Sequence, residues 1–274
     1  MKSFALALGG GGARGLAHIP VMEALEELEV KPVAIAGTSI GALVGSAYAA
    51  GMSAKEMRRY MLSIAHSPAE TRRRLLAARA GTLTDLLSGA FSQATQMDAE
   101  KFCAQFLPEA IPEDFATLAI PTTVMTTDLH RRQQAPLSSG LLRPALAAAI
   151  AIPGIFRPVT VDGRVLIDGG TTNPLPFDLL RGLADVIVAV DVLTAPPLER
   201  SDVPGTWEAL YVTINIMGSA IIASKLEHTT PDLLIRPNVA AFRTLDFYQA
   251  TSILRTAEPV KTEVIEKLGA LLSN

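Results

Sequence analysis

The chain has 274 residues, of which 49% are hydrophobic and 5% aromatic, and it carries a formal net charge of −3. This length suffices for one large domain with a substantial core, and the small and aliphatic side chains suit an α/β fold. The small net charge provides no field that would attract nucleic acid, and the single cysteine, Cys103, excludes an internal disulfide and fits a reducing compartment.

The first fifty residues alternate between strand-like and helix-like runs. We predict a strand at residues 3–8, a glycine run, a helix that extends through Glu29, a second strand at 33–36 and a further helix. This alternation is typical of βαβ units and of a parallel sheet. The apolar N-terminal run is too short for a signal peptide, so we interpret it as a buried strand. Pro20 is expected to kink the first helix or to mark its first turn.

Residues 52–118 have a helical pattern and are predicted to form a helical insertion within a single domain of residues 1–274. Its first helix begins with the capping box Ser53-Ala54-Lys55-Glu56, and Asp98 is placed to cap another helix. Residues 195–205 predict a loop. Further strands are expected at residues 122–126, 159–161, 165–167, 186–190 and 233–235, with a hairpin turn at Asp162-Gly163 and a closing helix at 257–272.

The most informative stretch is Gly37-Thr38-Ser39-Ile40-Gly41. An apolar run precedes it and a helix-like run follows it, and strand, G-x-S-x-G, helix is the layout of a nucleophile elbow. Such a turn lifts one serine out of the sheet, and its flanking glycines avoid the clashes that Cβ atoms would make. Ser39 is therefore the candidate nucleophile.

A glycine run, Gly9-Gly10-Gly11-Gly12-Ala13-Arg14-Gly15, separates the first strand from the first helix. It fits a dinucleotide fingerprint, but the next strand does not end in the acidic residue that this interpretation needs. A phosphate-binding loop would continue with Lys and Ser/Thr, where the chain has Leu16 and Ala17. A third interpretation is an oxyanion hole formed by consecutive amides at a helix N-terminus, with Arg14 adding positive charge. A turn that only lets the helix pack closely on the sheet is the structural alternative.

A serine nucleophile needs a proton acceptor. The four histidines, His18, His66, His130 and His228, lie in settings that favour structural or solvated roles. The more suggestive motif is Asp168-Gly169-Gly170, directly after the strand-like run 164–167. An aspartate at a strand end, followed by two glycines, places a carboxylate in a cleft with little steric cover, although Asp-Gly turns are also common.

Three motifs thus stand in order along the chain, at residues 10–15, 37–41 and 168–170. Together they resemble those of the patatin-like phospholipases, specifically the short bacterial members of the family. Residues 15–19, 152–159 and 173–176 resemble the same family. The resemblance covers roughly residues 3–192, with Pro20 standing where the family usually has a glycine.

The resemblance implies a three-layer α/β/α sandwich with a mainly parallel central sheet and a Ser39–Asp168 catalytic dyad. The family hydrolyses acyl esters of lipids and needs no metal, so we expect a lipid or acyl-ester substrate and no cofactor. In the implied mechanism Asp168 accepts the serine proton and later activates water. The oxyanion hole would comprise Gly10, Gly11, Gly12 and Arg14. The glycines of the family motifs are Gly15, Gly37, Gly41, Gly169 and Gly170.

Two alternatives stay open. Ser39, Asp168 and His228 run in the chain order of an α/β-hydrolase triad, although that fold places several strands before its elbow and only two fit here. The chain is alternatively a non-enzymatic or regulatory lipid-binding module on the same fold.

Membrane contact is the last feature that the sequence addresses. No uninterrupted run reaches transmembrane length, the nearest being residues 210–224, so we expect a cytoplasmic protein with peripheral contact at the inner membrane face as an option. Two surfaces are candidates for that contact. A basic one comprises Arg58, Arg59, Arg72, Arg73, Arg74 and Arg79. A stripe that would line an acyl pocket, face a membrane or belong to the core comprises Trp207, Tyr211, Ile214, Met217, Ile221 and Ile222.

Overall fold

The first predicted strand, β1 (Phe4–Leu8), is buried along its whole length at the centre of a sheet. It pairs in parallel with β2 (Ala34–Thr38) on one side and with β7 (Val186–Val190) on the other, and β8 (Leu233–Ile235) continues the parallel part beyond β7. The βαβ rhythm of the sequence is therefore confirmed. The structure is a computed structural model that describes residues 2–79, 96–194, 203 and 205–273.

The sheet changes from parallel to antiparallel beyond β2. Strand β3 (Thr122–Asp128) is parallel to β2, whereas β4 (Gln133–Leu137) and β6 (Arg164–Asp168) both run antiparallel to β3. Strand β5 (Val159–Val161) forms a hairpin with β6 through the predicted turn at Asp162 and Gly163. Followed from one hydrogen-bonded partner to the next, the strands are β5-β6-β3-β2-β1-β7-β8, with β4 also paired to β3. Strands β2 and β6 pair with successive parts of the same edge of β3, and β4 pairs with its other edge.

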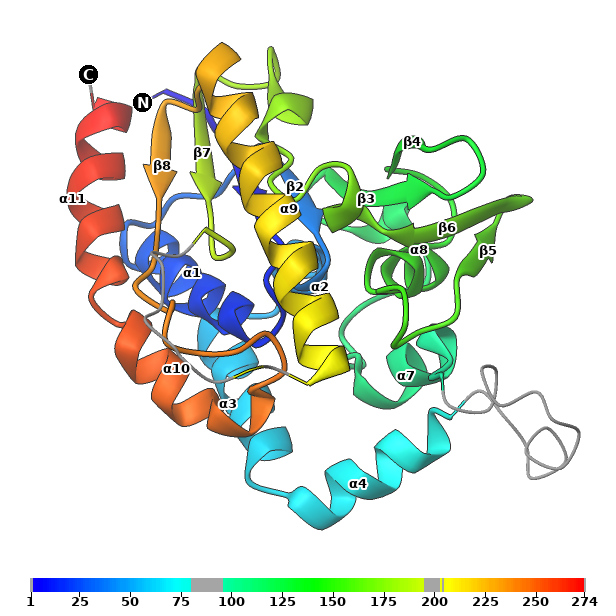
Figure 1. The fold of residues 1–274 in the computed structure, drawn as a ribbon. Helices are drawn as coiled ribbons and strands as arrows, with labels where there is room; N and C mark the ends of the chain where they lie inside the picture. Colours follow the sequence, from blue (N-terminus) through cyan, green and yellow to red (C-terminus); the bar gives the residue numbers. More distant parts are fainter. Residues whose placement is uncertain (1, 80–95, 195–202, 204, 274) are drawn as a thin grey trace, which may run out of the picture.

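Strand β1 shows why the two faces of the sheet are covered differently. Phe4, Leu6 and Leu8 belong to the larger core, whereas Ala5 and Ala7 point into a smaller one. The alanine face lies beneath residues 175–180 and the long helix α9 (Thr206–His228), which can approach closely because the side chains are short. The larger face packs against α1 (His18–Glu27), α2 (Ile40–Ala49), α8 (Leu142–Ala149), α10 (Ala250–Ala257) and α11 (Val260–Ser273). The predicted three-layer α/β/α arrangement is confirmed (Figure 1).

The helical insertion is confirmed in part. It contains α3 (Ala54–Ala65), α4 (Pro68–Ala77) and α7 (Ala99–Phe106), and the predicted caps at Ser53 and Asp98 are present. Residues 107–114 are not helical, because Pro108 and Pro112 interrupt the helical pattern. Residues 80–95 lie outside the described residues.

Other elements also differ from the predictions. The closing helix begins at Val260 rather than at 257, after Pro259, and α10 before it was not predicted. Strand β4 was missed because its sequence, Gln-Gln-Ala-Pro-Leu, lacks an apolar alternation. The first helix is preceded by a 3-10 turn at Gly12–Ala17, and Pro20 falls in the first turn of α1. Most of the predicted loop at 195–205 lies outside the described residues.

Helix α9 also changes what was expected of the membrane. By length and composition its segment Ala209–His228, with a mean hydropathy of 1.4, is the one helix among the described residues that is long and apolar enough to cross a bilayer. Only 11% of this segment is buried. The polar residues Thr213, Asn215 and Ser219 interrupt the apolar run, but they do not lower the mean hydropathy enough to exclude a span.

Candidate active site

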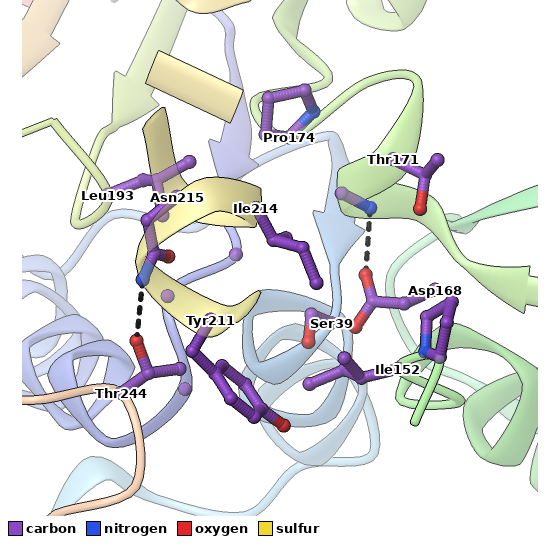
Figure 2. A pocket seen from close by; sticks show the side chains of 15 residues that line it. Ser39, Ile152, Asp168, Thr171, Pro174, Leu193, Tyr211, Ile214, Asn215 and Thr244 are labelled. Carbon is purple, nitrogen blue, oxygen red and sulfur yellow. Dashed lines mark hydrogen bonds between the residues drawn. The ribbon is translucent and has the colours of Figure 1, made fainter. Parts of the chain in front are cut away.

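The site forms where two strands meet end to end. Thr38, the last residue of β2, lies beside Met125 of β3, and Asp168, the last residue of β6, lies beside the next residue, Thr126. Because β4 occupies the opposite edge of β3, strands β2 and β6 share one edge, run in opposite directions and point their carboxyl ends at each other. This places Ser39 next to Asp168, and Figure 2 shows the two side chains together.

Ser39 adopts the backbone conformation of a nucleophile elbow. Its φ of 53° and ψ of −124° lie in a region that non-glycine residues rarely occupy, at a cost of about 1–3 kcal/mol. A Cβ atom at Gly37 would lie 2.5 Å from the Cα of Ala42, and one at Gly41 would lie 2.2 Å from the Leu8 carbonyl oxygen. Glycine is therefore required at both flanking positions, as the motif predicts.

Asp168 is buried and its carboxylate has two polar neighbours. The amide of Gly170 donates to Oδ1 at 2.7 Å, and the Ser39 hydroxyl lies close enough to the carboxylate to lower its pKa. Burial raises the pKa of Asp168 to about 6, and these two neighbours oppose this shift only in part. A Cβ atom at Gly169 would lie 2.3 Å from the carbonyl oxygen of Met125, so the close approach of this turn to β3 requires glycine.

The glycine run lies across the site from Asp168, and its members differ in what their amides do. Gly10, Gly11 and Gly12 all line the cavity in front of Ser39. The amide of Gly10 donates to the Pro174 carbonyl at 2.9 Å, whereas the amides of Gly11 and Gly12 have no hydrogen-bond acceptor in the described part of the chain. The two free amides suit an oxyanion hole, but Gly10 differs from the prediction because its donor is already used.

Arg14 lies behind the glycine run rather than in the cavity. Its guanidinium is buried, donating from Nη1 to the Leu193 carbonyl and from Nη2 to the side chain of Asn215, each at 3.2 Å. Burial lowers the pKa of Arg14, although the charge of Asp191 opposes the shift. This geometry does not favour the predicted contribution of the Arg14 guanidinium to the oxyanion hole. The side chain instead ties the loop to α9. Gly15, next along, lets the turn pack closely on Ile40.

Helix α9 covers the cavity. Tyr211, Ile214 and Asn215 contribute one wall, and Figure 2 shows them opposite Ser39 and Asp168. The cavity has a volume of about 50 Å³, whereas pockets that hold drug-sized ligands have roughly 300–1,000 Å³. The remaining wall comes from Ile152, Pro153, Gly170, Thr171, Pro174, Leu193 and Thr244.

Some of these lining residues had a sequence signal and others had none. Tyr211 and Ile214 belong to the predicted apolar stripe, but Met217 of the same stripe is exposed and Ile222 is buried in the smaller core. The side chain of Trp207 is outside the description. Asn215 and Thr244 were missed. The signal for Asn215 was a carboxamide within an otherwise apolar run, whereas Thr244 had no signal at all.

The histidines do not reach the site. His228 is exposed near the end of α9, where its Nδ1 lies 2.9 Å from the Ser224 carbonyl oxygen. His66 pairs with Thr251, and His130 is exposed. His18 is fully buried on α1, with Nε2 2.9 Å from the Gly9 carbonyl oxygen, and burial lowers its pKa to about 4. None of the four lines the cavity, so the geometry does not support a triad with His228.

Three of the six arginines of the predicted basic surface form ion pairs with residues that the structure describes. Arg58 forms ion pairs with Glu23 at 2.6 Å and with Glu258 at 2.9 Å. Arg73 and Arg74 share Glu70, at 2.7 and 3.0 Å. Arg58 thus faces two carboxylates, whereas Arg73 and Arg74 share one and together keep a net positive charge.

Known proteins match the chain over most of its length. The family model of the patatin-like phospholipases matches residues 6–181. An uncharacterized NTE family protein of Mycobacterium bovis is 39% identical over 189 residues, which are 69% of this chain and 48% of that protein. Lysophospholipase nte1 of Aspergillus niger is 27% identical over 294 residues, covering 97% of this chain and 18% of the fungal protein. The chain therefore spans about half the length of the mycobacterial relative and less than a fifth of the fungal one.

The fold is shared with a solved structure. The crystal structure of VipD from Legionella pneumophila matches with a TM-score of 0.51 and 15% identity, covering 97% of this chain and 66% of that one. The family model covers far more than half of the chain, and the glycine run, the serine elbow and the Asp-Gly-Gly turn all fall within its bounds. This chain belongs to the patatin-like phospholipase family.

Proposed function

We propose that this protein is a serine acyl hydrolase that cleaves acyl esters of lipids, with Ser39 as the nucleophile and Asp168 as the base. The observation that carries the proposal is the meeting of β2 and β6, which puts the strained Ser39 beside a buried carboxylate. Membership of a phospholipase family and the likeness to a fungal lysophospholipase support a lipid as the substrate. Phospholipase A, lysophospholipase and carboxylesterase activities all fit this chemistry.

The reaction proceeds in two stages. Asp168 takes the hydroxyl proton of Ser39 while Oγ attacks the ester carbonyl, and the amides of Gly11 and Gly12 stabilise the resulting oxyanion. The proton then passes from Asp168 to the departing alcohol, which leaves an acyl-serine. In the second stage Asp168 removes a proton from water, the hydroxide attacks the acyl-serine, and the fatty acid is released as Ser39 regains its proton.

The carboxylate is suited to this role by its surroundings. An aspartate with an ordinary pKa is a weak base for a serine hydroxyl, and the burial that raises the pKa of Asp168 to about 6 makes it a stronger one. The free amides at the opposite wall are already oriented before substrate arrives, and donors of this kind are worth about 3–4 kcal/mol each in the transition state.

The decisive experiment compares wild type with Ser39→Ala and Asp168→Asn. Hydrolysis of a nitrophenyl ester and of a phospholipid should be lost in the serine variant, together with the fluorophosphonate adduct seen by intact mass. Asp168→Asn should lose roughly a thousandfold in kcat/KM, because general-base catalysis contributes about 10²–10⁴-fold. Undiminished hydrolysis by Asp168→Asn would overturn the dyad. A well-folded wild type that takes no label would favour the lipid-binding module instead.

Contact with a lipid surface is the part of the proposal that concerns partners. An enzyme that takes an acyl ester from an aggregate must reach that aggregate, and ion pairs reduce the charge that Arg58, Arg73 and Arg74 offer for electrostatic attraction. A cytoplasmic location stays a prediction.

A further inference from the structure

Helix α9 presents an apolar face to solvent. From Ala209 to Ser224 it contains no charged residue. The side chains of Leu210, Val212, Ile216 and Met217 are 41%, 45%, 63% and 58% exposed, and we refer to these four residues as the outer face of α9. Exposed helices of soluble proteins normally carry charged side chains on the side that faces water. Among the described residues, the outer face of α9 therefore has no partner of the kind that its apolar composition favours.

The opposite side of the same helix closes the candidate active site. Tyr211, Ile214 and Asn215 line the cavity that contains Ser39. The cavity volume of about 50 Å³ has room for one or two water molecules, each of which occupies about 30 Å³ in the liquid, and none for an acyl chain. A lipid substrate therefore needs more room at Ser39 than this cover leaves.

The two halves of α9 are held differently. Towards its C-terminus Lys225 is anchored by the Asp178 carboxylate at 2.5 Å, by the Leu175 carbonyl at 3.0 Å and by the side chain of Asn173. Towards its N-terminus the cavity-facing attachment is Asn215, which accepts from Arg14 and donates to Thr244. The half that covers Ser39 is also the half that carries the outer face.

We propose that the outer face of α9 is the surface with which this protein docks on a lipid bilayer. The bilayer that supplies the substrate thus also binds the helix that covers Ser39. This inference rests on the proposed function for its choice of occupant. A helix that lies in the interface buries its apolar face about 5–10 Å into the boundary between headgroups and acyl chains. Leu245 and Tyr248, which follow the α9-bonded Thr244, are exposed as well, and Tyr248 is an amphipathic aromatic side chain of the kind enriched at that depth.

The polar atoms near the outer face of α9 favour a lipid over a protein as its partner. The hydroxyl of Thr213 donates to the Ala209 carbonyl at 2.9 Å, so it is satisfied within the helix. A hydroxyl group in an apolar medium needs a hydrogen-bond partner within the protein, because no water is available there. Protein interfaces instead carry about one intermolecular hydrogen bond per 100–200 Å² and need free donors and acceptors for them.

The test measures flotation with phosphatidylcholine vesicles, in a Ser39→Ala background so that hydrolysis cannot alter the lipid. The proposal predicts that Ser39→Ala floats and that adding Ile216→Glu with Met217→Glu weakens the partition coefficient by about tenfold or more, since burial of one such side chain is worth about 1.5–3 kcal/mol. Leu183→Glu is the matched control, because Leu183 is 57% exposed and lies in the turn before β7, outside the outer face of α9. It should float like its parent.

Three outcomes would overturn the docking surface. One is an absence of flotation, and another is equal flotation by the double variant and the control. The third is binding only to vesicles that contain phosphatidylglycerol and only at low salt, which would show that the arginines, and not the outer face of α9, bind the membrane. If sedimentation shows a dimer that the double variant dissociates and vesicles are not bound, the outer face is an interface between copies of the chain. Circular dichroism melts check that each variant folds.

Failure of the proposed function would look different. Hydrolysis of a soluble short-chain ester is measured with Ser39 intact, and the glutamate pair should leave it within about twofold of wild type, because these residues lie outside the cavity. An inactive wild type that nevertheless floats would reject the hydrolase and keep the docking surface. An active wild type that does not float would do the reverse.

Discussion

Ser39 and Asp168 are individually ordinary residues that the backbone makes unusual. The serine is held at a φ of 53°, and the carboxylate is buried with only the Gly170 amide and the serine hydroxyl to stabilise its charge. Both features cost stability and are retained where the surrounding structure over-determines them. At the residue scale, the site therefore combines a strained backbone at Ser39 with a desolvated carboxylate at Asp168.

The raised pKa of Asp168 predicts the pH dependence of the reaction. The base must be ionised, so kcat/KM for a soluble ester should rise with pH through about 6 and reach a plateau near pH 7. At pH 5 the ionised fraction is about one tenth, and activity should fall in proportion. Initial rates in buffers from pH 4.5 to 8, on protein shown by circular dichroism to stay folded, provide the measurement. A profile that stays flat down to pH 5 would mean that the carboxylate keeps an ordinary pKa.

At the scale of elements, the sequence predicted each strand and helix that carries a motif, but not how they meet. Residues 165–167 predict a strand that an aspartate follows, yet nothing in the local sequence indicates that β6 runs antiparallel to β3 and ends against β2. The pairing of Ser39 with Asp168 came from resemblance to a family, because contacts between segments 129 positions apart depend on register. Strand β4 escaped notice because Pro136 removes the usual strand signal, although an edge strand tolerates it.

The attachment of α9 to the glycine run yields a prediction at this scale. Asn215 bridges the buried guanidinium of Arg14 and the hydroxyl of Thr244. Asn215→Ala leaves Arg14 with one acceptor fewer, and we expect the free energy of unfolding to fall by about 2 kcal/mol, since hydrogen bonds to charged groups are worth about 1.5–3 kcal/mol. Asn215→Asp keeps an acceptor for Arg14 and should recover most of that loss. Urea titrations of the three proteins measure it, and an alanine variant as stable as wild type would show that the bridge contributes nothing.

At the scale of the whole molecule, two buried groups on opposite sides of the site make the stability depend on pH with opposite signs. His18 has a pKa of about 4 in the folded protein, against 6.5 when exposed. Below pH 6.5 the unfolded chain binds the proton and the folded one does not, so stability is lost as pH falls towards 4. Asp168 has a folded pKa of about 6 against 3.8. Its protonated form is favoured by folding, so its contribution is complete below pH 3.8 and is lost as pH rises through 6.

The two effects are of similar size, about 3 kcal/mol each from shifts of roughly two units, and they act over overlapping windows. In wild type they should largely cancel, and single variants should separate them.

Asp168→Asn removes the cost of a buried charge, so its stability relative to wild type should rise by about 3 kcal/mol between pH 3.8 and pH 7. His18→Gln keeps a donor for the Gly9 carbonyl, and its stability relative to wild type should rise by a similar amount as pH falls from 6.5 to 4. Denaturant unfolding at four pH values measures both differences. Two curves that tilt the same way would show that one of these groups is not buried as a neutral species, and the strand junction around Ser39 would then be open to water.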